Sequence, residues 1–266
     1  MRGLIEFYLI RSNVWVAICF AAMLAFFQLV LYHLNFYVLG IVFFGTLAIY
    51  NFSRIKNYKD FISLNSVYKP QIFLTILGLT GTLVCLVLRG FEIKTFLYLF
   101  VLGFISFCYS LPFSGLGLRT IPFLKLFLIA FVWAGSSIGL LLVVHHSLIQ
   151  YQLLFFAVFF FVIGITVPFD IRDKSTDESG LKTIPQVIGI LPSKIFSVLG
   201  LILSAVLFFL EFREFTTAVT AWTITAAISI LLVLNSNEEK SEHYYSFWME
   251  SCSLLPLLFF LIIGGV

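Results

Sequence analysis

Charged side chains are scarce in this chain, and aspartate is the scarcest of them. Asp, Glu, Lys and Arg together make up 11% of the 266 residues, whereas a soluble globular domain carries about 25%. So little charge excludes an ordinary soluble domain. The few aspartates are also unevenly placed, because three of them, Asp170, Asp173 and Asp177, follow one long apolar run.

The cysteines show no pattern that indicates a function. They stand singly within apolar stretches: Cys19, Cys85, Cys108 and Cys252. None of them belongs to a CxxC pair or has a partner at metal-ligand spacing. We therefore expect neither a disulfide framework nor a zinc site.

What the chain does contain is apolar sequence of membrane-spanning length. Hydrophobic residues make up 61% of it, 33 residues are phenylalanine, and the mean hydropathy is +1.08. A helix that crosses a bilayer needs about 20 mostly apolar residues and satisfies its own backbone polar groups. Nine such runs are bounded by charged, proline or turn residues: 14–32, 36–51, 72–89, 95–112, 122–144, 151–168, 194–211, 217–234 and 248–266. We predict an all-α polytopic transmembrane helical bundle of about nine helices, with residues 1–266 in a single integral-membrane domain.

The basic residues divide unevenly between the two sides of such a bundle. With nine spans, one side receives the N-terminus and four loops: 52–71, 113–121, 169–193 and 235–247. That side holds all the Lys and Arg residues except Arg89, Lys94 and Arg213. Because cytoplasmic loops are enriched in Lys and Arg, we expect the N-terminus and the Asp-rich loop to lie in the cytoplasm, with the chain in a bacterial-type inner membrane.

The three clustered aspartates have the spacing D-x-x-D-x-x-x-D. On a helix these positions fall within an arc of roughly 60°, where carboxylates repel one another unless a cation lies between them. Mg²⁺ favours a few carboxylate ligands together with substrate phosphates. Basic residues interleave with the acids: Arg172, Lys174 and Lys182. The pattern predicts a diphosphate site in which Asp170, Asp173 and Asp177 bind Mg²⁺ and act as the catalytic residues.

Two further stretches accompany this motif. "GLKTIPQVIG", Gly180–Gly189, follows the aspartates, and "YSLPF" and "PFLK", Tyr109–Phe113 and Pro122–Lys125, stand where the fourth and fifth spans join. Together with nine spans and an aspartate motif after the sixth, these stretches resemble the UbiA superfamily of membrane prenyltransferases. The resemblance covers the whole chain in layout and is sharpest at 170–189.

The resemblance implies a fold, an activity and a set of site residues. The fold is a helical bundle around a central cavity under a polar cytoplasmic cap. The activity is Mg²⁺-dependent transfer of a prenyl group from an isoprenyl diphosphate to a lipophilic acceptor, such as an aromatic or quinone-precursor compound; the lipid bilayer is the other partner, and we expect no nucleic acid. The residues expected to bind the diphosphate are Asn51, Lys69, Lys125, Arg172, Lys174 and Lys182. Tyr109 is expected to contact the prenyl chain or the acceptor.

The sequence departs from the family after its second span. A first motif, N-D-x-x-D-x-x-x-D, is typical there, but this chain reads "YNFSRIKNYKDF". Asn51 fits the leading amide, whereas Phe52, Ile55 and Lys59 stand in place of the carboxylates. Lysine neutralises phosphate as a point charge but does not bind Mg²⁺. The expected site therefore has one carboxylate cluster and an opposing side that is basic.

Other interpretations stay open. The aspartates could form a solvated loop paired with Arg172 and Lys174. A cyclase or diphosphate-lyase on the same scaffold would act on the prenyl diphosphate without an acceptor, and a non-catalytic relative would bind an isoprenoid or organise a membrane complex. A transporter is disfavoured, because the spans lack paired deep acids and show no inverted repeat.

Overall fold

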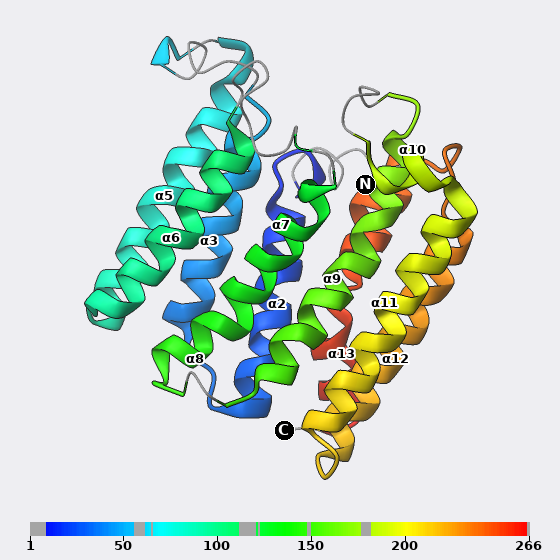
Figure 1. Cartoon of the computed structure of the whole chain (residues 1–266). Helices are drawn as coiled ribbons and strands as arrows, with labels where there is room; N and C mark the ends of the chain where they lie inside the picture. The colour runs from blue at the N-terminus through cyan, green and yellow to red at the C-terminus, as the bar shows by residue number, and fades with distance from the viewer. Residues whose placement is uncertain are drawn as a thin grey trace.

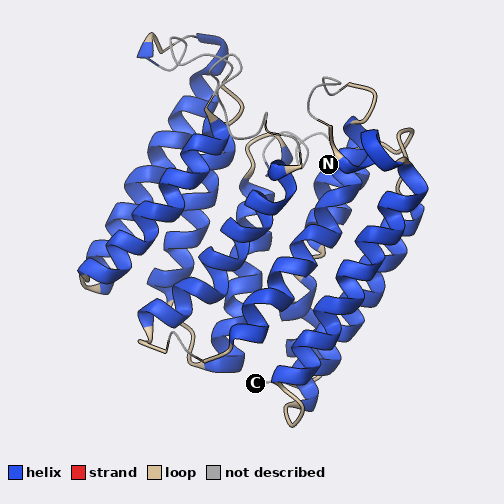
Figure 2. Ribbon diagram, viewed as in Figure 1, coloured by secondary structure: helices blue, strands red, loops and turns tan. Residues whose placement is uncertain are grey.

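The computed structural model describes residues 9–55, 62–64, 66–111, 121, 123–147, 150–176 and 182–264. Every regular element in these ranges is helical, as Figure 2 shows, so the all-α prediction is confirmed for the described residues. The longer helices are α2 Val14–Leu31, α3 Phe36–Phe52, α5 Lys69–Arg89, α6 Ile93–Ser110, α7 Leu124–Ala134, α9 Gln152–Asp173, α11 Ile190–Glu211 and α12 Thr216–Asn235. The shorter elements are η2 Ser66–Tyr68, η4 Gly135–Gly139, α8 Leu140–Val144, α10 Ile184–Ile188, η6 Tyr244–Met249 and α13 Leu255–Ile262.

Seven helical segments within the described residues are long and apolar enough to cross a membrane. They are α2, α5, α6, the continuous run α7–η4–α8, α9, α11 and α12. The predicted second and ninth spans are not single helices of membrane-spanning length, each for its own reason. Helix α3 has 17 residues and is about 26 Å long, against about 30 Å of hydrocarbon. The C-terminal run is divided by a turn at 252–254 ahead of Pro256. Seven spans are compatible with an integral membrane protein, and the count of nine stays a prediction.

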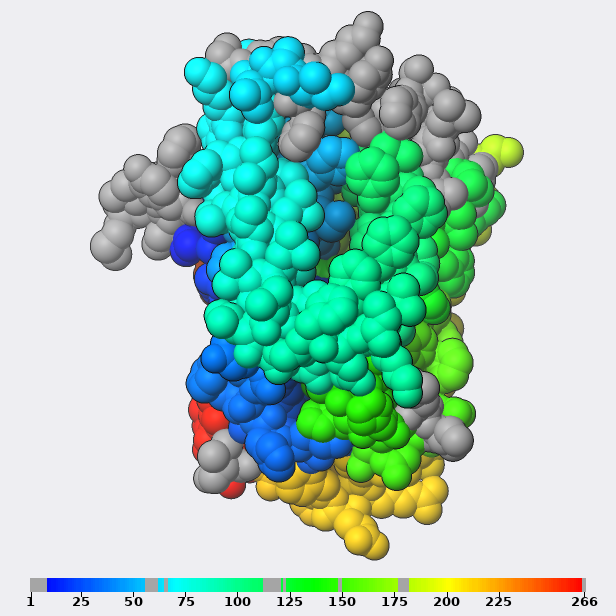
Figure 3. Space-filling view, turned by 90° about the vertical axis from the view of Figure 1, so that its left-hand side faces the viewer, coloured from blue at the N-terminus to red at the C-terminus, as the bar shows by residue number. Residues whose placement is uncertain are grey.

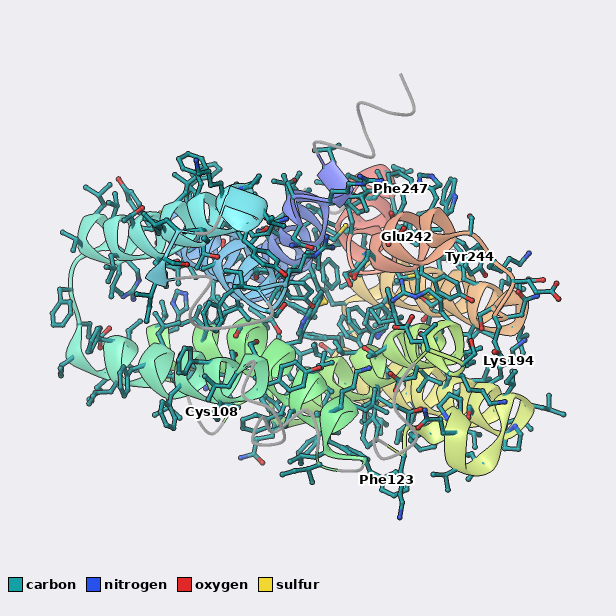
Figure 4. The ribbon with its side chains drawn as sticks, turned by 90° about the horizontal axis from the view of Figure 1, so that it is seen from above. Cys108, Phe123, Lys194, Glu242, Tyr244 and Phe247 are labelled. Atoms are coloured by element: carbon teal, nitrogen blue, oxygen red, sulfur yellow. The ribbon has the colours of Figure 1, made fainter. Side chains whose placement is uncertain are left out.

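The helices form two rows that are joined at their sides (Figures 1 and 4). Viewed from above, one row runs α5, α3, α2, α13 and α12, and the facing row runs α6, α7, α9 and α11. Contacts between neighbours follow this order, with α11 packed on α12 and α6 on α3 to connect the rows. Helices α3 and α9 end at the same end of the bundle (Figure 1).

Helices α3 and α5 are in close contact because Gly78 has no side chain. A Cβ built at Gly78 would lie 2.6 Å from the backbone N of Ala48 and 2.6 Å from the carbonyl O of Phe44. Small residues at membrane helix interfaces let two backbones approach in this way. The short helix α3 is thereby held along the longer α5.

Pro168 is accommodated in α9 one turn before the aspartates. Proline has no N–H, so the carbonyl of Gly164 loses its usual helical donor. Ser197 of α11 replaces it, donating from its hydroxyl to the Gly164 carbonyl across 2.5 Å. This bond fixes α9 to α11 directly below the segment that carries Asp170 and Asp173.

Aromatic rings fill the interior at the other end of the bundle. Trp222 of α12 stacks on Phe208 of α11 at 4.8 Å between ring centroids and lies 5.0 Å from Phe161 and 6.0 Å from Phe26. The indole N–H of Trp222 donates to the Ser204 hydroxyl at 3.1 Å, so its polar atom is satisfied. This packed cluster leaves the aspartate-bearing end as the place for a polar site.

Candidate functional site

The end of α9 places two of the three predicted aspartates in different surroundings. Asp170 is buried, with 2% of its surface exposed, and its Oδ1 accepts a hydrogen bond from Nζ of Lys125 at 2.7 Å. Lys125 lies in the first turn of α7, the neighbour of α9 in the same row. The two predicted site residues are therefore brought together as a buried ion pair. Asp177 lies outside the described residues.

Asp173 is held by its own chain neighbour. Nε and Nη2 of Arg172 donate to its two carboxylate oxygens at 2.6 and 2.8 Å. The Arg172 guanidinium lies 5.5 Å from the ring centroids of both Phe169 and Tyr245, the range of a cation–π contact. These two rings fix the arginine, and the arginine in turn fixes the orientation of the Asp173 carboxylate.

The remaining basic candidates are spread over this end of the bundle. Lys174 lies 3.9 Å from Glu238, in the connection that follows α12. Lys182 is exposed, with a left-handed backbone conformation at φ 45° just ahead of α10. Lys69 is also exposed and begins α5, which packs on α3 rather than on α9. Of these three, Lys174 lies nearest in sequence to the aspartates, and Lys69 lies on the opposite side of α3.

Asn51 lies at the end of α3 and is fully buried. Its side-chain amide donates to the carbonyls of Ser12 and Leu47, both at 2.9 Å, and its Oδ1 accepts from the amide of Asn13 at 3.3 Å. These bonds connect the start of α2 to the end of α3. They give Asn51 a structural role, and its contact with a diphosphate stays a prediction.

Two of the three positions where the first motif would have carboxylates hold apolar side chains that pack within the bundle. Phe52 stacks on Phe107 of α6 at 5.3 Å, and Ile55 is 1% exposed. Lys59 falls outside the described residues. The described part of this side therefore supplies packing contacts where a second carboxylate cluster would stand.

Positive charge gathers between the two rows. Partial burial lowers the pKa of Arg54; the nearby Glu242 carboxylate opposes this effect, and the charges of Arg11 and Arg172 add to it. Arg54 also donates to the Arg11 carbonyl at 3.2 Å. Figure 4 shows Glu242 on the C-terminal segment at this end, with Tyr244 and Phe247. An anion between Arg54 and Arg172 would relieve the repulsion between them.

Aromatic side chains lie below this charged layer. Tyr50 of α3 lies near Trp133 of α7. Trp133 also stacks on Phe20 at 4.1 Å. Trp133 follows Lys125 by eight residues, which is about 12 Å along a helix. The predicted residue Tyr109 lies at the end of α6, one residue before the helix ends.

Searches against family models, curated proteins and solved structures find nothing that matches this chain.

The described residues contain no group of three or more His, Cys, Asp or Glu side chains that could hold a metal ion. Of the three predicted aspartates, the structure describes Asp170 and Asp173, which lie one helical turn apart. Each of these two carboxylates is contacted by a cation. Carboxylate oxygens are nonetheless the ligands that Mg²⁺ favours, and one or two of them suffice when substrate phosphates complete its shell. The donor chemistry of Asp170 and Asp173 thus fits Mg²⁺, which stays a prediction.

Sequence reasoning missed two residues of this site. Asn13 and Tyr245 are far from the aspartates in sequence, and no spacing rule connects them to Asn51 or Arg172. Glu250 lies just inside the predicted last span, where the sequence is equally compatible with a buried functional role and with a place near the headgroups. In the structure Glu250 is half-buried, and the charge of Arg172 acts on it.

Proposed function

We propose that the chain is a membrane-embedded enzyme that transfers a prenyl group from an isoprenyl diphosphate to a lipophilic acceptor. The observation that supports this best is the juxtaposition of Asp170, Asp173, Lys125 and Arg172 at one end of a helical bundle, above an aromatic interior. A diphosphate needs both metal-binding oxygens and cations, and an isoprenyl chain needs a dry apolar cavity. This end of the molecule has the carboxylates and the cations, and aromatic side chains lie near it.

The diphosphate binds between the ends of α3 and α9 in this proposal. Arg54, Arg172 and Lys125 offset its charge, with Lys174, Lys182 and Lys69 at the margin. Arginine in particular offers paired N–H donors that match phosphate oxygens. Binding of the diphosphate would take Arg172 from Asp173 and leave that carboxylate available as a ligand.

Asp170 and Asp173, with Asp177, are the residues that would hold Mg²⁺. When bound, the ion neutralises charge that develops on the leaving diphosphate and so favours ionisation of the C–O bond. The chain's own contribution is to orient the diphosphate, with fixed cations aimed at the oxygens that gain charge. Burial of Asp170 beside Lys125 keeps this arrangement in place before substrate arrives.

The prenyl chain lies among the aromatic side chains below. Trp133, Tyr50 and Tyr109 present ring faces that stabilise an allylic cation, and exclusion of water prevents its hydrolysis. A hollow between the upper halves of α5 and α6, with α3 at its bottom, is visible in Figure 3. We assign this hollow to the lipophilic acceptor. The buried Ser110 hydroxyl at the end of α6 has no hydrogen-bond partner among the described residues and is placed to meet a polar group of the acceptor.

The proposal includes the membrane topology. We take α3 and the C-terminal η6–α13 segment as two further spans, which gives nine and puts the Asp-rich end in the cytoplasm. The partition of charge supports this, because the helix ends beside the aspartates carry Arg54, Lys125, Arg172 and Lys194, whereas the opposite end carries few basic residues.

The test is turnover by purified protein in lipid nanodiscs. Prenyl diphosphates of several lengths are screened with and without Mg²⁺ and acceptor, with pyrophosphate release and product mass as readouts. Asp170→Asn and Asp173→Asn should each lower the rate by at least about 100-fold. Glu239→Gln, which changes an exposed acid at the same end, is the matched control and should retain full activity.

Pyrophosphate release without acceptor would replace the transferase with a cyclase or diphosphate-lyase. Unchanged turnover in both aspartate variants would remove the role assigned to these carboxylates.

One observation favours a second candidate, a non-catalytic isoprenoid-binding protein. Both described aspartates are already engaged by cations, and the opposing side lacks a carboxylate cluster among its described residues. Such a protein would bind the prenyl diphosphate and release no pyrophosphate under any of these conditions.

A further inference from the structure

A groove lies at the end of the bundle opposite to the aspartates. It has a volume of about 800 Å³ and is formed between the first turns of α6 and the end of α8. One wall is the face of α6 that carries Lys94, Leu97, Tyr98 and Val101, spaced by three and four residues. The other wall includes Val143 and the polar residues that follow α8: His146, Ser147 and Gln150.

The inner wall of this groove depends on an irregular helix. Between α7 and α8 the chain adopts the π-helical turn η4, Gly135–Gly139, a feature that is rare and frequent at functional sites. The Tyr98 hydroxyl donates to the Gly135 carbonyl at 2.9 Å. A Cβ at Gly139 would lie 2.0 Å from that hydroxyl oxygen. Thus a widened turn and a glycine together make room for the tyrosine that lines the groove.

The mouth of the groove carries an excess of positive charge. Glu92 is contacted by Arg89 at 3.7 Å and by His146 at 3.4 Å, and it accepts a hydrogen bond from Thr95. Lys94 is exposed and has no ion pair among the described residues. Arg89 and Lys94 thus stand near a single carboxylate, Glu92, which contacts Arg89 and leaves the ammonium of Lys94 available for an anion.

The position of the groove and the polarity of its lining together indicate which kind of ligand it binds. The groove opens sideways on a helix whose exposed residues, such as Leu97 and Val101, would face lipid in a membrane. Most of its surface is apolar, and the ammonium of Lys94 lies at the helix end, where lipid headgroups are found. We propose that the groove is a binding site for an anionic phospholipid of the leaflet opposite to the aspartates, with the phosphate on Lys94 and part of one acyl chain along Leu97, Tyr98 and Val101.

The site is tested by native mass spectrometry of the purified full chain in the presence of phosphatidylglycerol or phosphatidylcholine. The wild type should retain one phosphatidylglycerol more tightly than any phosphatidylcholine. Lys94→Ala should weaken that lipid about fivefold, since a cation near a lipid headgroup contributes about 1 kcal/mol. Lys94→Arg should restore binding, and Arg213→Ala, an exposed basic residue in the α11–α12 connection, is the matched control.

A second pair of variants tests the groove independently of charge. Leu97→Trp should fill it and displace the retained lipid, whereas Leu83→Trp, on the exposed face of α5, should not. If Lys94→Ala and Arg213→Ala lose the same amount of bound phosphatidylglycerol, or if Leu97→Trp and Leu83→Trp do, only annular lipid is bound. Either result would overturn the proposal. Displacement of phosphatidylglycerol by an excess of inorganic phosphate would also overturn it, because the site would then bind a free anion.

Discussion

Lys125 and Asp170 form an ion pair between α7 and α9, with 2.7 Å between Nζ and Oδ1. The carboxylate is almost fully buried, and the lysine side chain is 25% exposed. Two of the residues assigned to the diphosphate site from sequence are thus also a structural connection between neighbouring helices. Their functional and structural contributions can be separated by measuring stability and activity in the same variants.

Lys125→Met should destabilise the protein by about 2 kcal/mol. Removing one partner of a buried pair costs about 3–5 kcal/mol, and the partial exposure of the lysine lowers that figure. Lys174→Met, whose pair with Glu238 is longer and more exposed, should cost less than about 1 kcal/mol. Denaturant unfolding in detergent micelles measures both. Adding Asp170→Asn to Lys125→Met should recover part of the loss, and strictly additive effects would show that the two side chains are not coupled.

Ser197→Ala should lower stability through the carbonyl that Pro168 leaves without a helical donor. The variant removes the donor to Gly164, with a cost of about 1–2 kcal/mol. Thr80→Ala is the control, because the Thr80 hydroxyl is exposed and bonds only within its own helix. Thermal unfolding should show a lower midpoint for the first variant alone. Equal midpoints would mean that the bond between α9 and α11 contributes nothing measurable.

Gly78→Ala should separate α3 from α5, because the added Cβ would lie 2.6 Å from backbone atoms that do not rotate away. A loss of about 1–3 kcal/mol is expected for such overpacking. Gly103→Ala places the same methyl group on α6 with no atom within 4 Å, so it should be neutral or slightly stabilising. The comparison is made by thermal unfolding in micelles. Tolerance of both substitutions would contradict the close packing of the two helices.

Stability should fall under acid conditions through His145. Its ring stacks on Tyr32 at 3.7 Å, and burial lowers its pKa, with Arg89, His33 and His146 acting in the same direction. The folded state therefore disfavours the protonated ring. Stability is fully present above the unfolded-state pKa of about 6.5 and is lost as pH falls through the folded-state pKa.

The measurement is the thermal midpoint between pH 7.5 and 5. Over this interval the thermal midpoint of the wild type should fall further than that of His145→Gln. The midpoint of His243→Gln, a change at the other end of the bundle, should fall as much as that of the wild type. Parallel curves for all three proteins would exclude His145 as the titrating group.

Most of the long helices could be predicted from the sequence, but only part of the candidate site could. Apolar runs predict α2, α9, α11 and α12 because span length is a physical requirement of the bilayer. They do not register the turn at 252–254 that divides the C-terminal run ahead of Pro256. The run boundary at residue 168 places Asp170 and Asp173 in a loop, whereas α9 continues through both, and their spacing gives no indication that Lys125 and Arg172 contact them. Such contacts depend on which helices pack together, as does the bond between Asn13 and Asn51.

The most direct test of the central claim is equilibrium binding of farnesyl diphosphate to the purified chain by titration calorimetry, with farnesol as the matched ligand without phosphate. We predict that the wild type binds farnesyl diphosphate in the presence of Mg²⁺, and that removal of Mg²⁺ or the substitution Asp173→Asn weakens binding at least about tenfold, while Glu239→Gln has no effect. Equal affinity of wild type and Asp173→Asn for farnesyl diphosphate, with and without Mg²⁺, would contradict the account.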